Sequence, residues 1–311
     1  MRILVIGQAA FGAKVFETLV EKGEDIVAVY CPPDRAGGRP DPLKEAAQAR
    51  HVPVYQPTTY KDDSVFEEYK SLRLDLTVMA FVTDIIPERF FQVPASGTIN
   101  YHPSLLPRHR GASAINWAVI MGDKRTGLSI FWPDGGIDTG PVLLQKEVAI
   151  TEEDTTGSVY FNKLFPMGVD ALVESVALVK EGNAPRIVQD EAGATYEPPC
   201  DDRVAGIDWN KPARELFNLV RGCDPQPGAF AYWKGEVVRF YAPRLVEEDA
   251  AKPPGTVVSL DDQGVHVAVN GGKLCIGRMK PEPGKKLAAA QFASEHGIEP
   301  GARFDAGSKG V

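Results

Sequence analysis

Asn100 and His102 are the residues whose types and spacing point most directly to chemistry. They lie two apart in the predicted strand Gly97–His102, so both side chains would project from the same face. Pro103 ends that strand and leaves His102 at its carboxyl end, where open parallel sheets place ligands. An amide beside an imidazole suits stabilisation of an oxyanion combined with proton transfer. The alternative, a histidine that only bonds a backbone carbonyl, is the weaker one given the asparagine and the rigid turn to Pro107.

A glycine-rich loop, Asp134–Gly140, offers a carboxylate to the same site. The loop follows the predicted strand Gly127–Trp132, and we expect it at the same edge of the sheet as His102. There Asp138 could reach the imidazole, orient it and favour its charged form. The alternative, which the loop alone leaves open, is an aspartate that only caps a turn.

A second glycine pattern, Gly7–Gly12, resembles a phosphate-binding turn without completing it. Ala9 stands where the dinucleotide fingerprint needs its second glycine. Cys31 and Pro32 stand where a carboxylate for the ribose would be expected. We therefore expect an ordinary strand-to-helix turn and no NAD(P), and a nucleotide-binding module without catalysis is the least favoured function.

Strands and helices alternate over the first two hundred residues, which predicts an α/β domain with a doubly wound, mostly parallel, Rossmann-like sheet. Apolar spacing marks further helices within residues 15–20 and 65–72. The polar stretch Glu191–Asp202 predicts a linker, so the first domain is predicted at residues 1–200. The predicted strands are Arg2–Ile6, Ile26–Tyr30, Val52–Tyr55, Leu74–Phe81, Gly97–His102 and Gly127–Trp132, and the predicted helices are Leu43–Arg50, Ala112–Met121 and Val159–Lys180.

The pattern changes at residue 206, where a helix (Pro212–Val220) is followed by short alternating runs. Short strands with turns between them predict a small β-barrel or sandwich, which we assign to a second domain at residues 206–311. The predicted strands are Ala229–Trp233, Val237–Tyr241, Gly255–Ser259, Val265–Val269 and Lys273–Arg278.

Composition limits the class of protein. The chain has 311 residues, 43% hydrophobic and 24% charged, which is ordinary for a globular protein of two domains. No run approaches the roughly 20 apolar residues of a membrane helix, and the chain enters a strand pattern at once, so we expect a cytoplasmic protein without a membrane partner. The four cysteines are far apart and in no paired spacing, which argues against a structural zinc site and a disulfide framework.

The long motif that begins at Asn100 and ends at Pro107, with Gly111 after it and Asp138-Thr-Gly after a strand, resembles the formyltransferases that use 10-formyltetrahydrofolate. The resemblance implies that Asn100, His102 and Asp138 form a catalytic trio. It covers essentially the whole chain. The stretch from Ile207 to Ala229 is similar to the start of the C-terminal domain of the larger members, which implies an OB-like barrel.

The resemblance also implies a folate site and no metal. It places the pterin ring against Asp84, Ile85 and Ile86, which follow the strand Leu74–Phe81. The backbone there can bond the edge of the pterin while the isoleucines form an apolar wall. The residues implied to line the pocket near the folate are Ser104, Leu105, Leu106 and Pro107, together with Asp138.

The formyl acceptor stays open between water and an amine. Stretches such as Asp41-Pro-Leu43 and Ser129–Trp132 look like the hydrolase domain of 10-formyltetrahydrofolate dehydrogenases. Asn100 departs from the animal dehydrogenases, which carry an aliphatic residue there, and agrees with the transferases. A complete trio suits transfer to an amine, sugar amines included, as well as to water.

Methionyl-tRNA formyltransferases are the alternative within the resemblance, but a nucleic acid partner is not favoured. Their longer basic loop is replaced here by the short stretch Pro33–Arg39, which has no lysine. From Gly206 onward there are 14 Lys and Arg against 13 Asp and Glu, a net charge of +1, and the whole chain carries −8. Binding of a polyanion needs a cation near each neutralised phosphate, so this is a poor tRNA surface.

Overall fold

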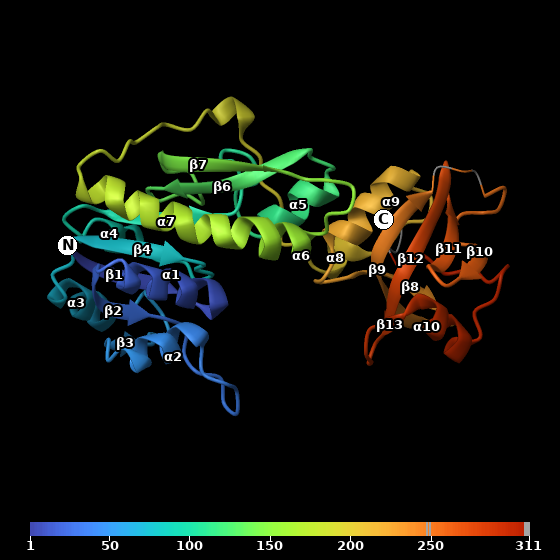
Figure 1. The fold of residues 1–311 in the computed structure, drawn as a ribbon, viewed down its shortest axis with the longest axis horizontal. Coiled ribbons are helices and arrows are strands. Elements are labelled where there is room, and N and C mark those ends of the chain that lie inside the picture. Colours follow the sequence, from blue (N-terminus) through green and yellow to red (C-terminus); the bar gives the residue numbers. More distant parts are fainter. Residues whose placement is uncertain (247, 249, 308–311) are drawn as a thin grey trace. The chain divides into compact units, whose positions relative to one another are not determined.

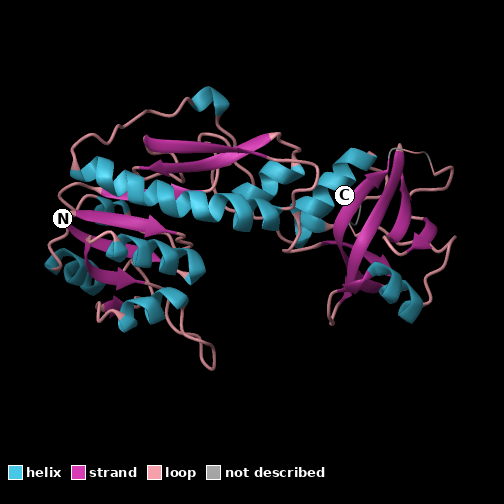
Figure 2. Ribbon diagram, in the orientation of Figure 1, coloured by secondary structure: helices cyan, strands magenta, loops and turns pink. Residues whose placement is uncertain are grey.

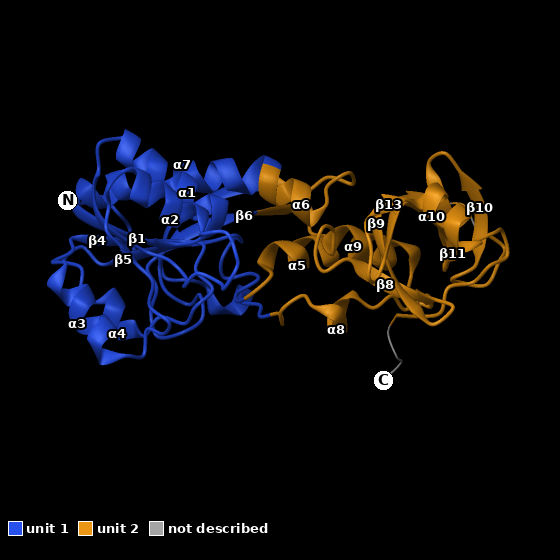
Figure 3. Cartoon of the chain, turned by 90° about the horizontal axis from the view of Figure 1, so that it is seen from below, with its two compact units in different colours: residues 1–111, 127–148, 162–196 blue, residues 112–126, 149–161, 197–311 orange. Residues whose placement is uncertain are grey.

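The computed structural model describes residues 1–246, 248 and 250–307, which form two compact units (Figure 3). Unit 1 comprises residues 1–111, 127–148 and 162–196, and unit 2 comprises residues 112–126, 149–161 and the chain from residue 197 onward. Each unit joins segments that are distant in sequence, so one cut near residue 200 does not separate them. The division into domains 1–200 and 206–311 remains a proposal.

Unit 1 is built on a twisted sheet whose described strands follow the order β3-β2-β1-β4-β5-β6-β7 (Figure 1). The strands from β3 to β5 are parallel, and β6 runs antiparallel to β5. This order confirms the predicted doubly wound, mostly parallel α/β fold. The strands are β1 (Arg2–Gly7), β2 (Asp25–Tyr30), β3 (Val54–Tyr55), β4 (Leu76–Ala80), β5 (Thr98–His102), β6 (Arg125–Phe131) and β7 (Val142–Ala149).

Two hydrophobic cores cover the two faces of this sheet because the side chains of each strand alternate. Ile3 and Val5 of β1 belong to one core, and Leu4 and Ile6 belong to the other. Helices α1 (Ala9–Glu21), α2 (Pro42–Ala49) and α7 (Phe165–Lys180) contribute to the first core, and α3 (Asp63–Ser71) and α4 (Glu88–Phe91) contribute to the second. Figure 2 shows the helices of the chain in cyan beside the strands in magenta. A π-helical turn, Val159–Leu164, precedes α7, and a 3-10 turn spans Glu191–Gly193.

The glycine turn after β1 is a structural turn. A Cβ at Gly7 would overlap the carbonyl oxygen of Ala80 on the neighbouring strand, so glycine is required for close approach. The backbone N–H of Ala9, at the start of α1, donates to both oxygens of the Asp41 carboxylate, at 3.1 and 2.9 Å. The same carboxylate accepts from Leu43 and caps α2. A protein carboxylate thus occupies the helix end that a phosphate would need, in agreement with the predicted strand-to-helix turn.

Unit 2 contains an antiparallel sheet packed against helices. Its described strands follow the order β10-β11-β12-β9-β8, with β13 paired to β12. The core of unit 2 gathers Trp209, Phe217, Phe240 and Phe304, all nearly or completely buried. The strands are β8 (Ala229–Trp233), β9 (Glu236–Val246), β10 (Val257–Asp261), β11 (Gly264–Val269), β12 (Gly272–Pro281) and β13 (Leu287–Ala288), and the helices are α5 (Ala114–Ile120), α6 (Thr156–Ser158), α8 (Asp202–Ala205), α9 (Ala213–Gly222) and α10 (Ala289–His296).

The predicted strands of this region are all present, and β9 and β12 are longer than predicted. Helix α10 of unit 2 was not predicted from the sequence, and neither was strand β7 in the sheet of unit 1. Among the described residues, no helix combines the length and the apolar character needed to cross a membrane.

Candidate active site

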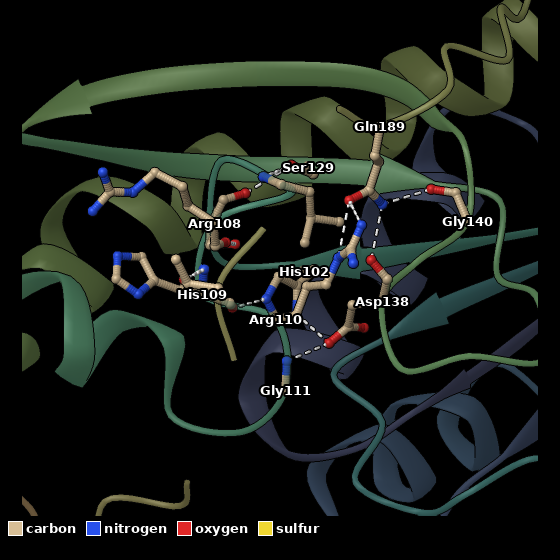
Figure 4. Close-up of polar contacts among 12 residues, drawn as sticks. His102, Arg108, His109, Arg110, Gly111, Ser129, Asp138, Gly140 and Gln189 are labelled. Carbon is tan, nitrogen blue, oxygen red and sulfur yellow. Dashed lines mark hydrogen bonds and ion pairs between the residues drawn. The ribbon is translucent and has the colours of Figure 1, made fainter. Parts of the chain in front are cut away.

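His102 lies at the carboxyl end of β5, 6% exposed, and its two ring nitrogens face oxygen atoms (Figure 4). Nε2 lies 2.8 Å from the carbonyl oxygen of His109, and Nδ1 lies 3.4 Å from Oδ2 of Asp138. Because a carbonyl only accepts, the hydrogen sits on Nε2, and Nδ1 is the nitrogen that faces the carboxylate. The carbonyl contact that the sequence left as an alternative exists, and it fixes the ring without displacing Asp138.

Asp138 reaches the imidazole by a route that the sequence did not predict. We expected its loop at the carboxyl edge of the sheet, but β6 is antiparallel to β5, with Phe131 opposite Asn100 and Ser129 opposite His102. The end of β6 therefore lies toward the start of β5, which makes that expectation wrong. The loop folds back toward His102, where Oδ2 of Asp138 accepts a hydrogen bond of 2.8 Å from the backbone N–H of Gly111.

The fold of the loop Asp134–Gly140 back toward His102 explains which residues stand at two of its positions. Asp138 has a φ of +56°, a left-handed conformation that costs most side chains roughly 1–2 kcal/mol and that aspartate tolerates better than most. A Cβ at Gly140 would overlap the carbonyl oxygen of Trp132, so the return of the chain onto β6 requires glycine there. Within the loop, Oδ1 of Asp134 accepts from the N–H of Gly136 and from the hydroxyl of Thr139.

Asn100 lies in the middle of β5 between Met79 of β4 and Phe131 of β6. Its side chain is half-buried and shares a strand face with that of His102. Within the described part of the chain no hydrogen bond of its side-chain amide is found, so the amide is available to a ligand.

The turn after His102 is fixed by hydrogen bonds from β6 and β7. The hydroxyl of Ser129 donates to the carbonyl of Ser104 at 2.7 Å and accepts from the N–H of Leu106 at 3.0 Å. Gln145 donates to the carbonyl of Leu106 and to the Ser129 hydroxyl. Ser104 and Leu106 are buried, while Leu105 and Pro107 are half-buried. The part of this turn with surface to offer a ligand is therefore Leu105 and Pro107.

The segment that follows β4 presents apolar side chains outward. Ile85 is 85% exposed and Phe81 is 42% exposed, whereas Ile86 is buried in the sheet core. Asp84 is exposed, and its charge adds to burial, the larger effect, in raising the pKa of Tyr60. A Cβ at Gly135 would touch the carboxylate of Glu88, so the Asp138 loop approaches the residues just beyond Ile86. The exposed side chain of Ile85 is thus apolar surface that the core does not cover.

A buried polar network that the sequence does not predict lies behind Asp138. Gln189 is 7% exposed and Arg110 is 1% exposed, and the two side chains bond each other. Gln189 lies just before the predicted linker Glu191–Asp202, whose first residues are themselves packed on unit 1. The N–H of His109 donates to the hydroxyl of Thr195, and the N–H of Arg110 donates to its carbonyl. The linker prediction is therefore wrong for Glu191–Tyr196.

Arg110 also bonds both ends of the segment Glu191–Tyr196. Its guanidinium donates to both carboxylate oxygens of Glu191, at 2.9 and 2.6 Å, and to the hydroxyl of Tyr196 at 2.7 Å. These bonds raise the pKa of Arg110 and lower that of Glu191. Among the described residues no group of three or more His, Cys, Asp or Glu side chains could hold a metal ion. The site brings together an anchored imidazole, a carboxylate and an amide, which can stabilise an oxyanion and move a proton.

Comparison with known proteins matches both halves of the chain to one family. Residues 1–176 match the family model described as formyl transferase, and residues 201–297 match that of the formyl transferase C-terminal domain. The chain is 41% identical over 310 residues to mitochondrial 10-formyltetrahydrofolate dehydrogenase from Mus musculus, covering 94% of this chain and 33% of the relative. It thus spans about a third of the length of that dehydrogenase.

One further relative and two solved structures are also similar to this chain. Methionyl-tRNA formyltransferase from Pelotomaculum thermopropionicum is 38% identical over 298 residues, covering 94% of this chain and 95% of the relative. HypX from Aquifex aeolicus in complex with tetrahydrofolic acid has a TM-score of 0.69 at 20% identity, covering 95% of this chain and 47% of that one. An N-formyltransferase from Helicobacter canadensis in complex with folinic acid and dTDP-3-aminofucose has a TM-score of 0.70 at 17% identity, covering 92% and 99%. At these identities the structural likeness shows the fold alone.

Proposed function

Because this chain belongs to the formyltransferase family, whose enzymes use 10-formyltetrahydrofolate, we propose that it releases or transfers the formyl group of that folate at Asn100, His102 and Asp138. The observation that carries the assignment of residues is the contact between Nδ1 of His102 and the Asp138 carboxylate. It stands at the end of the strand that also carries Asn100, whose side-chain amide has no hydrogen bond among the described residues.

The proposed reaction begins with attack of water or an amine on the formyl carbon, which gives a tetrahedral oxyanion. The Asn100 amide and the N–H at Nδ1 of protonated His102 donate to that oxyanion. The 3.4 Å separation from Asp138 is longer than a charge-assisted hydrogen bond, so Asp138 holds this N–H loosely and the formyl oxygen can share it. The attacking group loses its proton through Asp138. The bond from carbon to N10 of the folate then breaks, and N10 takes up the proton that Asp138 received, leaving tetrahydrofolate with formate or a formylated amine.

For the folate, we propose a site between the segment Asp84–Ile86 and the turn Ser104–Pro107. Ile85, exposed over most of its surface, would cover one face of the pterin ring, and backbone groups of Asp84 and Ile86 would bond its polar edge. Leu105 and Pro107 supply the half-buried surface on the opposite side. We propose no metal and no NAD(P) for this reaction.

The proposed acceptor of the formyl group is water or a small amine, and the small amines include sugar amines. A methionyl-tRNA acceptor is the second candidate, favoured by the match over 95% of the methionyl-tRNA formyltransferase. The charge of the chain argues against a tRNA acceptor. The part from Gly206 onward carries a net charge of only +1, from 14 Lys and Arg against 13 Asp and Glu. We further propose that unit 2 is OB-like and that the protein works in the cytoplasm.

The test supplies 10-formyltetrahydrofolate to the purified chain and follows tetrahydrofolate by chromatography. Water alone, a panel of small and sugar amines, and methionyl-tRNA at several salt concentrations form the separate reactions. We expect release with water or with a small amine. Turnover that needs methionyl-tRNA and falls steeply with salt would replace the proposed acceptor, and no turnover with any acceptor would contradict the function.

A further inference from the structure

Gln189 holds the backbone of Asp138 from behind. Its side-chain Nε2 donates to the carbonyl oxygen of Asp138 at 2.8 Å and to that of Gly140 at 2.7 Å (Figure 4). One amide group therefore bridges the residues on both sides of Thr139. The bridge holds a residue whose φ of +56° would otherwise be costly, and so restricts the direction in which the carboxylate points.

Arg110 fixes the orientation of that amide. Its Nε and Nη2 donate to Oε1 of Gln189 at 3.2 and 2.8 Å. Donors thus face one end of the Gln189 amide and carbonyl acceptors face the other, so the opposite orientation would break every one of these bonds. Arg110 is 1% exposed and lies in the chain between His109, whose carbonyl binds the imidazole, and Gly111, whose N–H binds Asp138.

We propose that Gln189 is a positioning residue of the active site, held by Arg110, which directs the Asp138 carboxylate toward His102. This inference rests on the proposed function, because it assigns Gln189 an effect on that reaction. Among the described residues no hydrogen bond joins Gln189 to the imidazole, so its main route to the site is Asp138, whose backbone carbonyl it bonds. Its loss should therefore reproduce the loss of the carboxylate and should add little to it.

The kinetic test is a double-mutant comparison. Gln189→Met removes all four hydrogen bonds at similar side-chain length, and a misplacement near 1 Å of a reacting group costs about a hundredfold in rate. We expect kcat to fall by about that factor while KM for the folate changes little. Gln189→Met combined with Asp138→Asn should be hardly slower than Asp138→Asn alone, whereas Gln189→Met combined with Asn100→Ala should show multiplied losses. Multiplied losses with Asp138→Asn would overturn the inference.

A second readout does not depend on turnover. The N–H of Gly111 is bonded to the Asp138 carboxylate, and a hydrogen bond to a charged group contributes about 1.5–3 kcal/mol, so its loss should speed hydrogen exchange at Gly111 about tenfold or more. Unchanged exchange at Gly111 in Gln189→Met would refute the positioning role even if the enzyme proved inactive on every acceptor. Inactivity of the wild type would instead refute the proposed function, so the two failures are distinguishable.

Two further variants separate positioning from general stability. Glu191→Gln changes the exposed partner of Arg110 in the same segment and leaves the Gln189 bonds intact, so kcat and the exchange at Gly111 should stay near wild type. If Gln189→Met does not fold, Gln189→Glu keeps the size and the Arg110 contact and removes only the donors to the two carbonyls. It should then show the same loss of kcat and the same faster exchange. Equal effects of Glu191→Gln would overturn the inference.

Discussion

Replacement of Asp138 by asparagine tests the electrostatic part of the mechanism, and its size follows from the structure. Oδ2 of Asp138 lies 3.4 Å from Nδ1 of His102, and two unit charges at that distance attract by about 5 kcal/mol at an effective dielectric constant near 20. The Asp138 side chain is 15% exposed, so solvent weakens this attraction. We therefore take about half of the Coulomb energy as the stabilisation that the charged imidazole receives. About 2.5 kcal/mol of lost stabilisation of the charged imidazole corresponds to about a hundredfold lower kcat.

The assay for this variant compares kcat and KM for 10-formyltetrahydrofolate with those of a matched change in the same loop. Asp134→Asn also replaces a carboxylate by an amide, and its oxygen can still accept from Gly136 and Thr139. Asp134 has no contact with the imidazole among the hydrogen bonds and ion pairs found, so this control should retain near-normal kcat. If Asp138→Asn keeps more than about a third of the wild-type kcat, Asp138 only closes the loop onto Gly111.

Three further predictions concern the oxyanion, the folate and pH. Asn100→Ile should depress transfer to an amine by about a hundredfold and hydrolysis much less, because water can replace a missing donor; equal losses in the two rates would show that Asn100 does not select the acceptor. Ile85→Ser should raise KM for the folate by about tenfold or more without changing kcat, since burying an isoleucine contributes about 1.5–3 kcal/mol. An unchanged KM would contradict the proposed contact between the pterin ring and Ile85. Hydrogen bonds from Arg239 lower the pKa of Glu282, so the stability this pair provides is present above the unfolded pKa of about 4.3 and is lost as pH falls through the lower folded value. Thermal unfolding of Glu282→Gln should therefore vary less with pH below about 4.3 than that of the wild type, and parallel curves would contradict this.

The sequence was sufficient for the part of the site that is local. Asn100 and His102 share a strand face because strands alternate, and that spacing is visible without a structure. The contact of Asp138 with His102 was also predicted, but from a wrong placement of its loop. The direction of β6 relative to β5 depends on pairing across the sheet and leaves no local pattern in the chain.

Gln189 could not be predicted for a related reason. Its neighbours in the sequence are polar or exposed, with Val188 83% exposed, so the segment has the composition of a linker. Burial of Gln189 follows from an antiparallel bridge between Ile187 and Val142 and from bonds to Arg110, which is distant in sequence. A signal existed in Arg110 itself, a charged residue that closely follows the motif Asn100–Pro107 and needs partners if it is buried.

The most direct test of the central claim is the turnover of His102→Ala measured together with its affinity for the folate. In the proposed mechanism the histidine acts mainly on the transition state, so we expect tetrahydrofolate release to be abolished while the dissociation constant for a folate analogue stays within about tenfold of wild type. The loss of the bond to His109 should leave the fold intact, which thermal unfolding can verify. Wild-type turnover in His102→Ala would contradict the account.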